Sequence, residues 1–249
     1  MKIVSVTDIS AEAREAAQRH GLGELEQAFA EIPIKIKLST LLKGGGVKDV
    51  GNRLCLFRNG LIRHSAADGT APEVFRWDQI ETTYQLREIR YHRQRPERHY
   101  RYDGTRYQYR FIKPGGVELR VGEGVFHDPT KFNKEKSGNL FNSHDEQQYA
   151  DAGQIACERV AQVQLPAAMR ALEAGGTLSF GKASISMAGV DTGKGMVPWQ
   201  DLSELQVKNG SVVIKKQGKF FSLFDQPAAA IPNFQVFVVL ASAMRRQSI

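Results

Sequence analysis

Long apolar runs are missing from this chain of 249 residues. The longest run, Val236 to Ala241, is far shorter than the roughly 20 residues that a helix needs to cross a bilayer. The first fifteen residues acquire charge before any apolar stretch develops, so a signal peptide is not expected. We therefore expect a soluble, cytoplasmic protein, with the inner face of the membrane as an alternative location.

Cysteine is scarce as well, with two residues in the whole chain. Cys55 and Cys157 lie far apart in the sequence and lack the spacing of metal ligands. Cys55 stands in the apolar run 54–57, and Cys157 has small neighbours in a predicted helix. We interpret both as buried small hydrophobic residues rather than as a disulfide or a nucleophile.

Recognisable catalytic and ligand motifs are also missing. The six histidines lack the helical spacing typical of zinc ligands, and no Gly-x-Ser-x-Gly nucleophile motif occurs. The stretch Gly176–Lys182 is close to a phosphate-binding P-loop, but it follows a predicted helix and has Ala183 in place of the Ser or Thr that binds magnesium. We interpret it as a turn. The sequence thus predicts no enzyme, metal or cofactor, although an enzyme built from scattered residues stays open.

The composition is that of a folded protein, with 41% hydrophobic and 24% charged residues. Near the N-terminus, Ser10 is a suitable N-cap and Gly21 a suitable end for a helix. The residues 23–29 have a second short helical pattern that ends before Pro33. These two segments predict a short helical N-terminal region.

Strand patterns follow from about residue 52. The Asn59-Gly60 pair between apolar arms predicts a hairpin, and the alternating stretches 106–112 and 117–121 predict a second one across Pro114. A helix should begin at Ser143, because Glu146 completes a capping box. Its apolar stripe has helical spacing, and Pro166 should kink or restart it. The stripe consists of Tyr149, Ala152, Ala156, Val160 and Val163.

Short strands then resume, separated by Gly or Asn-Gly turns, and a helix begins near Ile231. The predicted strands are 178–180, 183–187, 196–199, 202–208, 211–215 and 219–224. The buried stripe of the final helix is expected to be Phe234, Phe237, Val238, Ala241 and Met244.

This order of short strands followed by one amphipathic helix occurs twice. Each copy contains one of the two tryptophans in a similar phrase, FRWDQI around Trp77 and VPWQDL around Trp199. A glycine and an aliphatic residue precede each phrase, at Gly60 and at Gly189. The pattern indicates a duplication. We expect both tryptophans in the core, each with its indole N–H bonded to a nearby carbonyl.

The chain resembles bacterial pleckstrin-homology-like domains, and from about residue 52 to 244 it resembles an uncharacterised bacterial family with two such units in tandem. The phrases that carry the resemblance are LFRNGL, VFRWDQI, LPAAMRALEAGG, VPWQDL and IPNFQVFVVLASAM. It implies a mainly β (α+β) fold in which each unit is a bent antiparallel sheet capped by a C-terminal helix. The expected parts are a helical segment 1–50, a first unit 51–175 and a second unit 176–249. The resemblance implies no activity, substrate or catalytic residue.

The net charge of +7 comes largely from one segment. Residues 87–113 contain nine Lys or Arg against three acidic residues, a net +6. Arginines that alternate with tyrosines offer bidentate donors and stacking surface to an anionic partner. The candidate binding residues are Arg87, Arg90, Tyr91, Arg93, Arg95, Arg98, Tyr100, Arg101 and Arg106.

The main hypothesis is a non-enzymatic interaction module whose basic hairpin docks an acidic protein. Anionic lipid headgroups are the alternative partner, and nucleic acid is less favoured than either. A reading without a ligand also stays open, in which the arginines protect an exposed strand edge from pairing with other chains.

Overall fold

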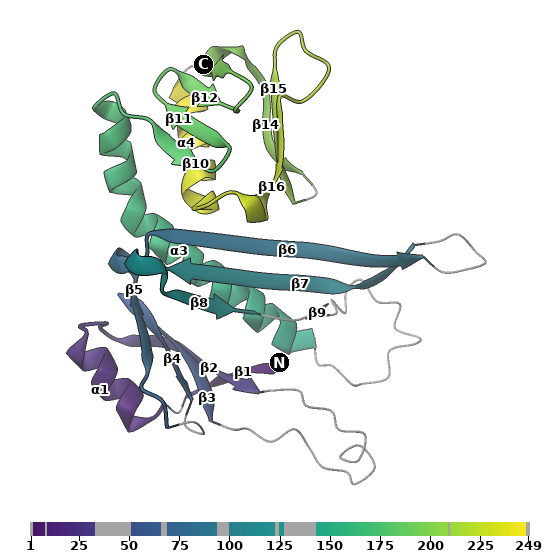
Figure 1. The fold of residues 1–249 in the computed structure, drawn as a ribbon. Coiled ribbons are helices and arrows are strands. Elements are labelled where there is room, and N and C mark those ends of the chain that lie inside the picture. The colour runs from purple at the N-terminus through teal and green to yellow at the C-terminus, as the bar shows by residue number, and fades with distance from the viewer. Residues whose placement is uncertain are drawn as a thin grey trace. The chain divides into compact units, whose positions relative to one another are not determined.

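The computed structural model describes residues 2–7, 9–32, 51–65, 69–93, 100–122, 125–126, 143–208 and 210–247. Its fold is mixed α+β with mostly antiparallel sheets, as the sequence predicts at this level, and the described part contains three α-helices (Figure 1). The chain divides into two compact units, each assembled from separate stretches of sequence. The first unit comprises 1–80, 89–107 and 121–156, and the second comprises 81–88, 108–120 and 157–249.

A five-stranded antiparallel sheet dominates the first unit. Its strands follow the chain order β1 (Lys2–Val6), β2 (Leu25–Ile32), β3 (Asn52–Phe57), β4 (Gly60–Ser65) and β5 (Glu73–Arg76). The helix α1 (Ala11–Arg19) begins where predicted, because the side chain of Ser10 accepts a hydrogen bond from the Ala13 amide. Its buried alanines pack with Cys55, Phe57 and Ile62 of the sheet.

The prediction of a second helix at 23–29 is wrong. These residues lead into β2, which lies between β1 and β3 and pairs Ala28 with Val6 and with Cys55. Leu, Glu and Ala favour a helix locally, but hydrogen bonding to two neighbouring strands and burial of Ala28, Phe29 and Ala30 override that preference. Among the described residues of the expected helical segment 1–50, α1 is therefore the only helix.

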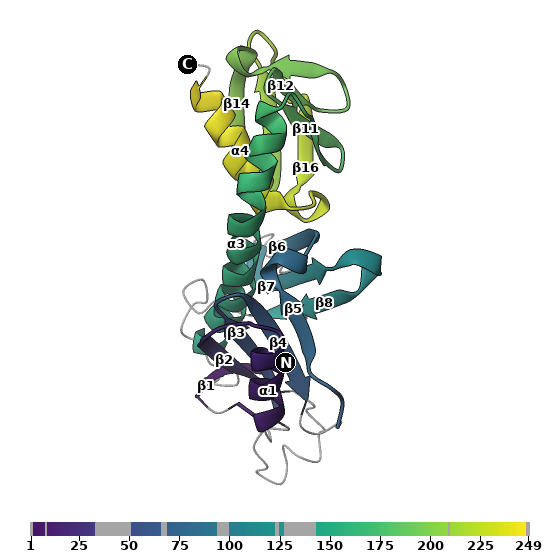
Figure 2. The ribbon, with the colours of Figure 1, turned by 90° about the vertical axis from the view of Figure 1, so that its left-hand side faces the viewer.

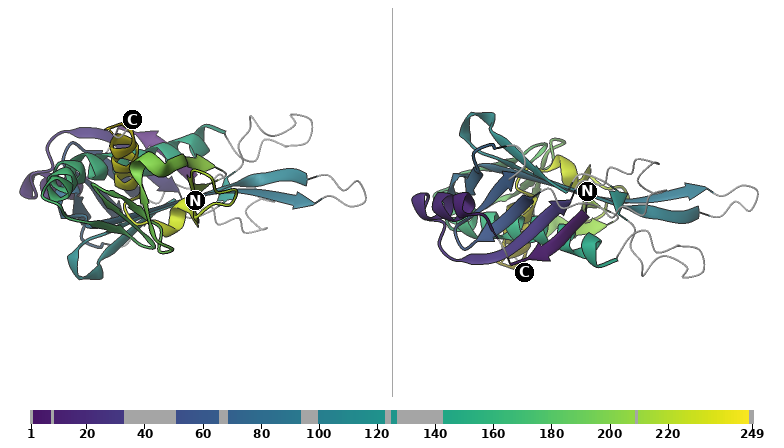
Figure 3. Two further views of the ribbon diagram at one scale, coloured as in Figure 1. Left: turned by 90° about the horizontal axis from the view of Figure 1, so that it is seen from above. Right: turned by 90° about the horizontal axis from the view of Figure 1, so that it is seen from below.

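A second sheet contains two long strands. β6 (Thr82–Arg93) and β7 (Tyr100–Ile112) are hydrogen-bonded neighbours, β8 (Glu118–Val121) continues the order, and β9 (Val125–Phe126) pairs with β7. Figure 3 shows β6 and β7 side by side along their length. The predicted hairpin of β7 and β8 is confirmed, with the short 3-10 helix η2 (Pro114–Gly116) as its turn.

The long helix α3 (Ser143–Glu173) begins where the sequence predicts and continues as one helix through Pro166. Ala152, Ala156 and Val160 of the predicted stripe are buried, but Val163 is exposed. Pro166 is exposed as well, and so is Gln162, so water can solvate the Gln162 carbonyl that the proline leaves without a helical donor. The helix therefore tolerates the proline instead of restarting at it.

The second unit contains two further antiparallel sheets and a C-terminal helix. The first has the order β10 (Leu178–Phe180), β11 (Ala183–Ser186), β12 (Gly189–Asp191) and β13 (Met196–Pro198). The second has the order β14 (Leu202–Lys208), β15 (Ser211–Lys216) and β16 (Phe224–Pro227). The helix α4 (Phe234–Gln247) ends the described chain, after the 3-10 helix η4 (Ala228–Ala230).

The core of this unit contains residues from both of its sheets and from the helices α3 and α4. Phe237 and Leu240 of α4 are fully buried, and the ring of Phe237 meets Phe180 edge-on at 5.3 Å. Leu172 of α3 and Ile185 of β11 belong to the same cluster. The C-terminal part of α3 lies beside α4 in both views (Figures 1 and 2). The predicted stripe of α4 is buried except for Val238, which is half-buried.

One predicted strand of this unit is displaced along the sequence. Residues 219–224 were expected to be a strand, whereas β16 begins only at Phe224 and residues 217–223 form a loop. The pairing of Ile214 with Phe224 fixes this register and buries Phe224. Phe220 and Phe221 consequently lie outside the sheet, although their apolar character is typical of a buried strand.

Candidate functional site

The structure brings the predicted basic residues onto one ribbon, formed by β6 and β7. Arg87, Arg90, Tyr91 and Arg93 belong to β6, and Tyr100, Arg101 and Arg106 belong to β7. Arg95 and Arg98 lie outside the described residues. Because neighbouring strands lie only about 5 Å apart, positions far apart in the sequence share one narrow surface.

The base of the ribbon consists of residues 82–88 of β6 and 106–112 of β7. Arg87 is exposed on β6 and Arg106 is half-buried on β7. The buried residues here are Thr83 of β6 and Tyr109 and Phe111 of β7. Burial of Tyr109 and Phe111, two residues apart, shows that β7 presents one of its two faces to the core.

An ion-pair network lies beside this base and was not predicted. The Arg110 guanidinium donates two hydrogen bonds of 2.8 Å to the two carboxylate oxygens of Glu118, and Arg120 donates to Glu118 as well. Arg110 also lies over the ring of Tyr84, 5.0 Å from its centroid. These contacts, chiefly the bond from Arg110, lower the pKa of Glu118 to about 2.

This network assigns Arg110 a structural role. Its charge is matched by Glu118 across the β7–β8 hairpin, so it contributes little to attraction at a distance. The signal was present in the sequence, because Arg110 and Glu118 stand on the two arms of the predicted hairpin. Periodicity alone does not predict which arginine of the basic segment forms an ion pair with a carboxylate.

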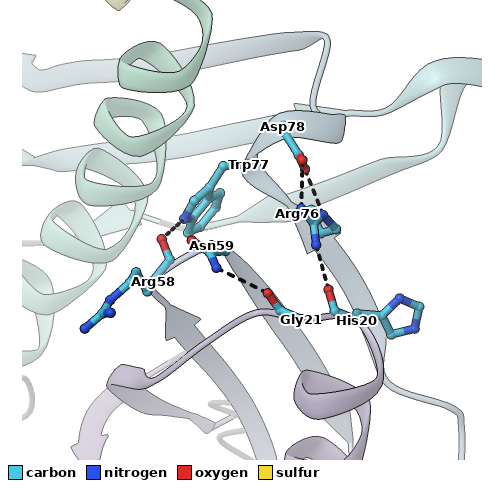
Figure 4. Close-up of polar contacts among 7 residues, drawn as sticks. All are labelled: His20, Gly21, Arg58, Asn59, Arg76, Trp77 and Asp78. Atoms are coloured by element: carbon cyan, nitrogen blue, oxygen red, sulfur yellow. Dashed lines mark hydrogen bonds and ion pairs between the residues drawn. The ribbon is translucent and has the colours of Figure 1, made fainter.

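The phrases around Trp77 hold the first unit together through polar contacts (Figure 4). The indole N–H of Trp77 donates to the carbonyl of Arg58 at 3.0 Å, and the side chain is 3% exposed. The side-chain Nδ2 of Asn59 donates to the carbonyl of Gly21 at 3.2 Å. The prediction of a buried tryptophan with a carbonyl partner is confirmed, and this tryptophan is a structural residue.

Arg76 connects the same turn to the end of α1. Its guanidinium donates two hydrogen bonds to the Asp78 carboxylate, at 2.9 and 2.8 Å, and a third to the carbonyl of His20 at 2.8 Å (Figure 4). The bond from Arg76 lowers the pKa of Asp78. The carbonyl of His20 lies at the C-terminus of α1, where cationic groups are favourable.

The second unit repeats this local structure. Trp199 donates from its indole N–H to the carbonyl of Ser186 at 3.0 Å, and it is 4% exposed. Trp77 and Trp199 each begin a 3-10 helix of three residues, η1 (Trp77–Gln79) and η3 (Trp199–Asp201). The similarity of the two phrases in the sequence therefore extends to their conformation and their hydrogen bonding.

The two glycines of the repeat share one physical requirement. Gly60 pairs with Arg76 and Gly189 with Pro198, in each case the residue before the tryptophan. A Cβ atom at Gly60 would lie 2.5 Å from the carbonyl oxygen of Phe75, and one at Gly189 would lie 2.2 Å from that of Val197. Neither strand pair leaves room for a side chain.

Asn233 links the start of α4 to the start of β6. Its side-chain oxygen accepts from the Thr83 amide at 2.8 Å, and its Nδ2 donates to the Glu81 carbonyl at 2.9 Å. Its own amide donates to the Thr83 carbonyl at 2.9 Å. Asn233 has a φ of 51°, a left-handed conformation that Asn adopts more readily than most residues. This contact between residues about 150 positions apart is invisible to sequence patterns.

Both cysteines and one histidine lie in the packed interior of the protein. Cys55 and Cys157 are buried, as predicted, and burial raises the pKa of the Cys157 thiol. The ring of His64 is buried, with its Nδ1 3.1 Å from the Ser10 hydroxyl. Within the described residues, no group of three or more His, Cys, Asp or Glu is placed to hold a metal ion. The stretch 176–182, interpreted from the sequence as a turn, contains β10 at 178–180 and a turn only at 181–182.

Residues 127–248 match the model of a family of unknown function, DUF6585. This match covers slightly less than half of the chain and includes three of the five phrases that carry the resemblance. No curated protein and no solved structure matches the chain. In the described part, every helix is too short or too polar to span a membrane.

Proposed function

We propose that the chain is a non-enzymatic interaction module that docks an acidic protein through the ribbon of β6 and β7. The observation that carries the proposal is the concentration of charge: the segment 87–113 holds a net +6 of the total +7. Most of that segment belongs to two adjacent strands of 12 and 13 residues. A long ribbon lets several arginines meet one partner at the same time, because its strands keep them on a common frame.

The composition of the ribbon favours a protein over a lipid surface. Arginine and tyrosine are the residue types enriched at the centres of protein–protein interfaces, where both bury large areas and donate hydrogen bonds. Tyr91 on β6 and Tyr100 on β7 stand next to basic positions. Binding of anionic lipid headgroups by the same arginines is the alternative function.

We also propose that the scaffold consists of two pleckstrin-homology-like units, with boundaries near 51–175 and 176–249. The order of elements after residue 176 supports this: four antiparallel strands, three antiparallel strands and a terminal helix. The first unit has a similar order, with β3, β4 and β5 in its first sheet, β6, β7 and β8 in its second and α3 as its helix, while β1 and β2 extend the first sheet from outside these bounds. The shared arrangement of glycine and tryptophan supports a duplication.

The test compares two variants with equal net charge. The first changes Arg90, Arg93 and Arg101 to Glu, and the second changes Arg170, Lys182 and Lys194 to Glu. Three reversals alter the charge by six units, so both variants carry +1 instead of +7. The three residues of the second variant are exposed and lie away from the ribbon in the sequence. Each protein is used as bait for cross-linked partners and floated with anionic and neutral vesicles.

Loss of an acidic partner protein in the ribbon variant, with retention in the control variant, is the expected result. Capture should weaken as salt rises, because exposed charges are screened over about 10 Å at 0.1 M salt. If both variants keep the same partners, the ribbon is not the docking surface. If the ribbon variant instead loses flotation with anionic vesicles while its protein partners are unchanged, the lipid alternative replaces the proposal.

A further inference from the structure

Two adjacent phenylalanines are displayed in the loop that joins β15 to β16. Phe220 is 96% exposed and Phe221 is 87% exposed. The other exposed large hydrophobic residues of the described chain lie between 37% and 54%. Isolated apolar residues at a surface are common, but two neighbouring aromatic side chains left almost wholly in water indicate a binding function.

The base of this loop is anchored to the 3-10 helix η3. The backbone amide of Gln217 donates to the Asp201 carbonyl at 2.8 Å, and its side-chain amide donates to the Gln200 carbonyl at 3.2 Å. Lys216 forms an ion pair of 3.2 Å with the Asp201 carboxylate. On the far side, the Leu223 amide donates to the Ile214 carbonyl at 2.9 Å. The loop therefore presents its tip from a base held on both sides.

Basic side chains gather at the same end of the unit. Lys215, Lys216 and Lys219 belong to the loop and its approach, and Arg245 donates to the Ser203 carbonyl at 3.3 Å, which brings the end of α4 to the start of β14. Arg246 follows on α4. Figure 1 shows both the loop after β15 and the end of α4 in the upper part of this unit.

The acidic residues of this end do not balance those cations. Glu204 pairs with Lys215 at 2.5 Å, and Asp201 pairs with Lys216. Asp225 of β16 is a third carboxylate near the loop, so five cations against three carboxylates leave a net charge of +2 around the phenylalanine pair. The surface is thus apolar at its tip and cationic around it.

We propose that this phenylalanine tip docks on an anionic lipid bilayer, with Phe220 and Phe221 in the interfacial layer and the surrounding lysines and arginines at the headgroups. Exposed aromatic residues beside cations match the two parts of such an interface, an apolar boundary beneath a negatively charged surface. Lysine reaches headgroups while its aliphatic stem stays against apolar surface. A fluid bilayer also adapts to a convex tip. The inference concerns a surface other than the ribbon and does not depend on the proposed partner.

Sedimentation with vesicles of phosphatidylcholine alone and of phosphatidylcholine with phosphatidylglycerol tests it. The wild type should bind the phosphatidylglycerol vesicles, and the double variant Phe220→Ser with Phe221→Ser should lose at least about tenfold in partition coefficient, since burial of even one phenylalanine is worth more than that factor. Val207→Ser is the matched control, because Val207 is 50% exposed near the other end of β14. It should bind like the wild type.

A tryptophan at the tip gives a second measurement. Trp77 and Trp199 are buried, so Phe221→Trp adds an exposed fluorophore whose emission should shift to the blue with phosphatidylglycerol vesicles and be quenched by brominated lipids. Absence of that shift, or equal binding by the double serine variant, overturns the proposal. Loss of a concentration-dependent dimer in the serine variant, without vesicle binding by the wild type, would assign the tip to a second copy instead. The Arg90, Arg93 and Arg101 variant should bind the vesicles as well as the control variant of equal net charge, which separates this surface from the ribbon.

Discussion

Gly60 and Gly189 explain why two short phrases of the sequence recur. Each glycine pairs with the strand that ends just before a tryptophan, and the carbonyl of that strand lies too close to the glycine for a side chain to fit. The tryptophan then donates to a carbonyl in the turn before that glycine. The glycine and the tryptophan of each copy are therefore explained by packing and hydrogen bonding.

Gly189→Ala should lower the free energy of unfolding by at least about 2 kcal/mol, a typical cost of overpacking. The added methyl group would lie 2.2 Å from the Val197 oxygen and 2.9 Å from the Cα atom of Pro198, so the two strands must separate. Urea unfolding, followed by circular dichroism, measures the change.

Gly218→Ala is the control for this substitution. Gly218 has a φ of 72°, and an added methyl group there would meet no atom within 4 Å, so its cost is conformational only, about 1 kcal/mol. Equal effects of the two substitutions would mean that backbone conformation, rather than the close strand contact, explains the glycine at 189.

Glu118 makes stability depend on pH. Its pKa of about 2 in the folded protein lies below the ordinary value of 4.5, because Arg110 and Arg120 donate to the carboxylate. Folding is therefore favoured by this group above about pH 4.5, and the contribution is lost as the pH falls from there to about 2.

Glu118→Gln should lower the free energy of unfolding by about 1–2 kcal/mol at neutral pH, a range reduced for the partial exposure of both arginines. The difference from the wild type should shrink toward zero as the pH approaches 2. Denaturant unfolding at a series of pH values measures it, with Glu173→Gln at the exposed end of α3 as the control. A difference that stays constant with pH would contradict an electrostatic role.

At the scale of elements, hydrogen bonds of Asn233 hold the N-terminus of α4 against the start of β6. Thr83 is buried, and its amide has the Asn233 side chain as acceptor, so removal of that side chain leaves a buried donor unsatisfied. The left-handed conformation of Asn233 adds a second requirement, which glycine meets and alanine does not.

Two substitutions separate these requirements. Asn233→Gly should cost about 2 kcal/mol for the lost hydrogen bonds, and Asn233→Ala should cost about 1 kcal/mol more for the strained backbone. Urea unfolding gives both values, and amide hydrogen exchange at Thr83 should accelerate in both variants. Equal stability of the alanine and glycine variants would show that the left-handed conformation is relaxed without cost.

In the whole molecule, the most basic segment and the most exposed aromatic residues are different parts of the sequence. The ribbon segment holds a net +6, the tip holds Phe220 and Phe221, and we propose a different kind of partner for each. Variants of equal net charge are therefore needed to test the ribbon, since the overall charge alone changes attraction to any anionic partner. Replacing the two phenylalanines of the tip by serine tests the tip without any change of charge.

The sequence by itself determined the features that depend on neighbouring residues. It predicted the N-cap at Ser10, a hairpin near Asn59, another across Pro114, and the burial of both tryptophans, and the structure confirms each. The loop of the first hairpin is Arg58-Asn59 rather than Asn59-Gly60, because Gly60 pairs with Phe57 as the first residue of β4. Caps and tight turns need particular side chains or φ angles within a few residues, so their chemistry is visible locally. The concentration of basic residues on β6 and β7 was equally visible as composition.

Only the tertiary structure decided the features that depend on a distant partner. The residues 23–29 have helical propensity, but the two neighbouring strands make them part of β2. The register of β15 with β16 leaves Phe220 and Phe221 in water, although their apolar pattern predicts a strand. Asn233 meets Thr83 across 150 positions. Pairing and burial depend on which segments meet in space, and local propensity yields to them because they involve larger free energies.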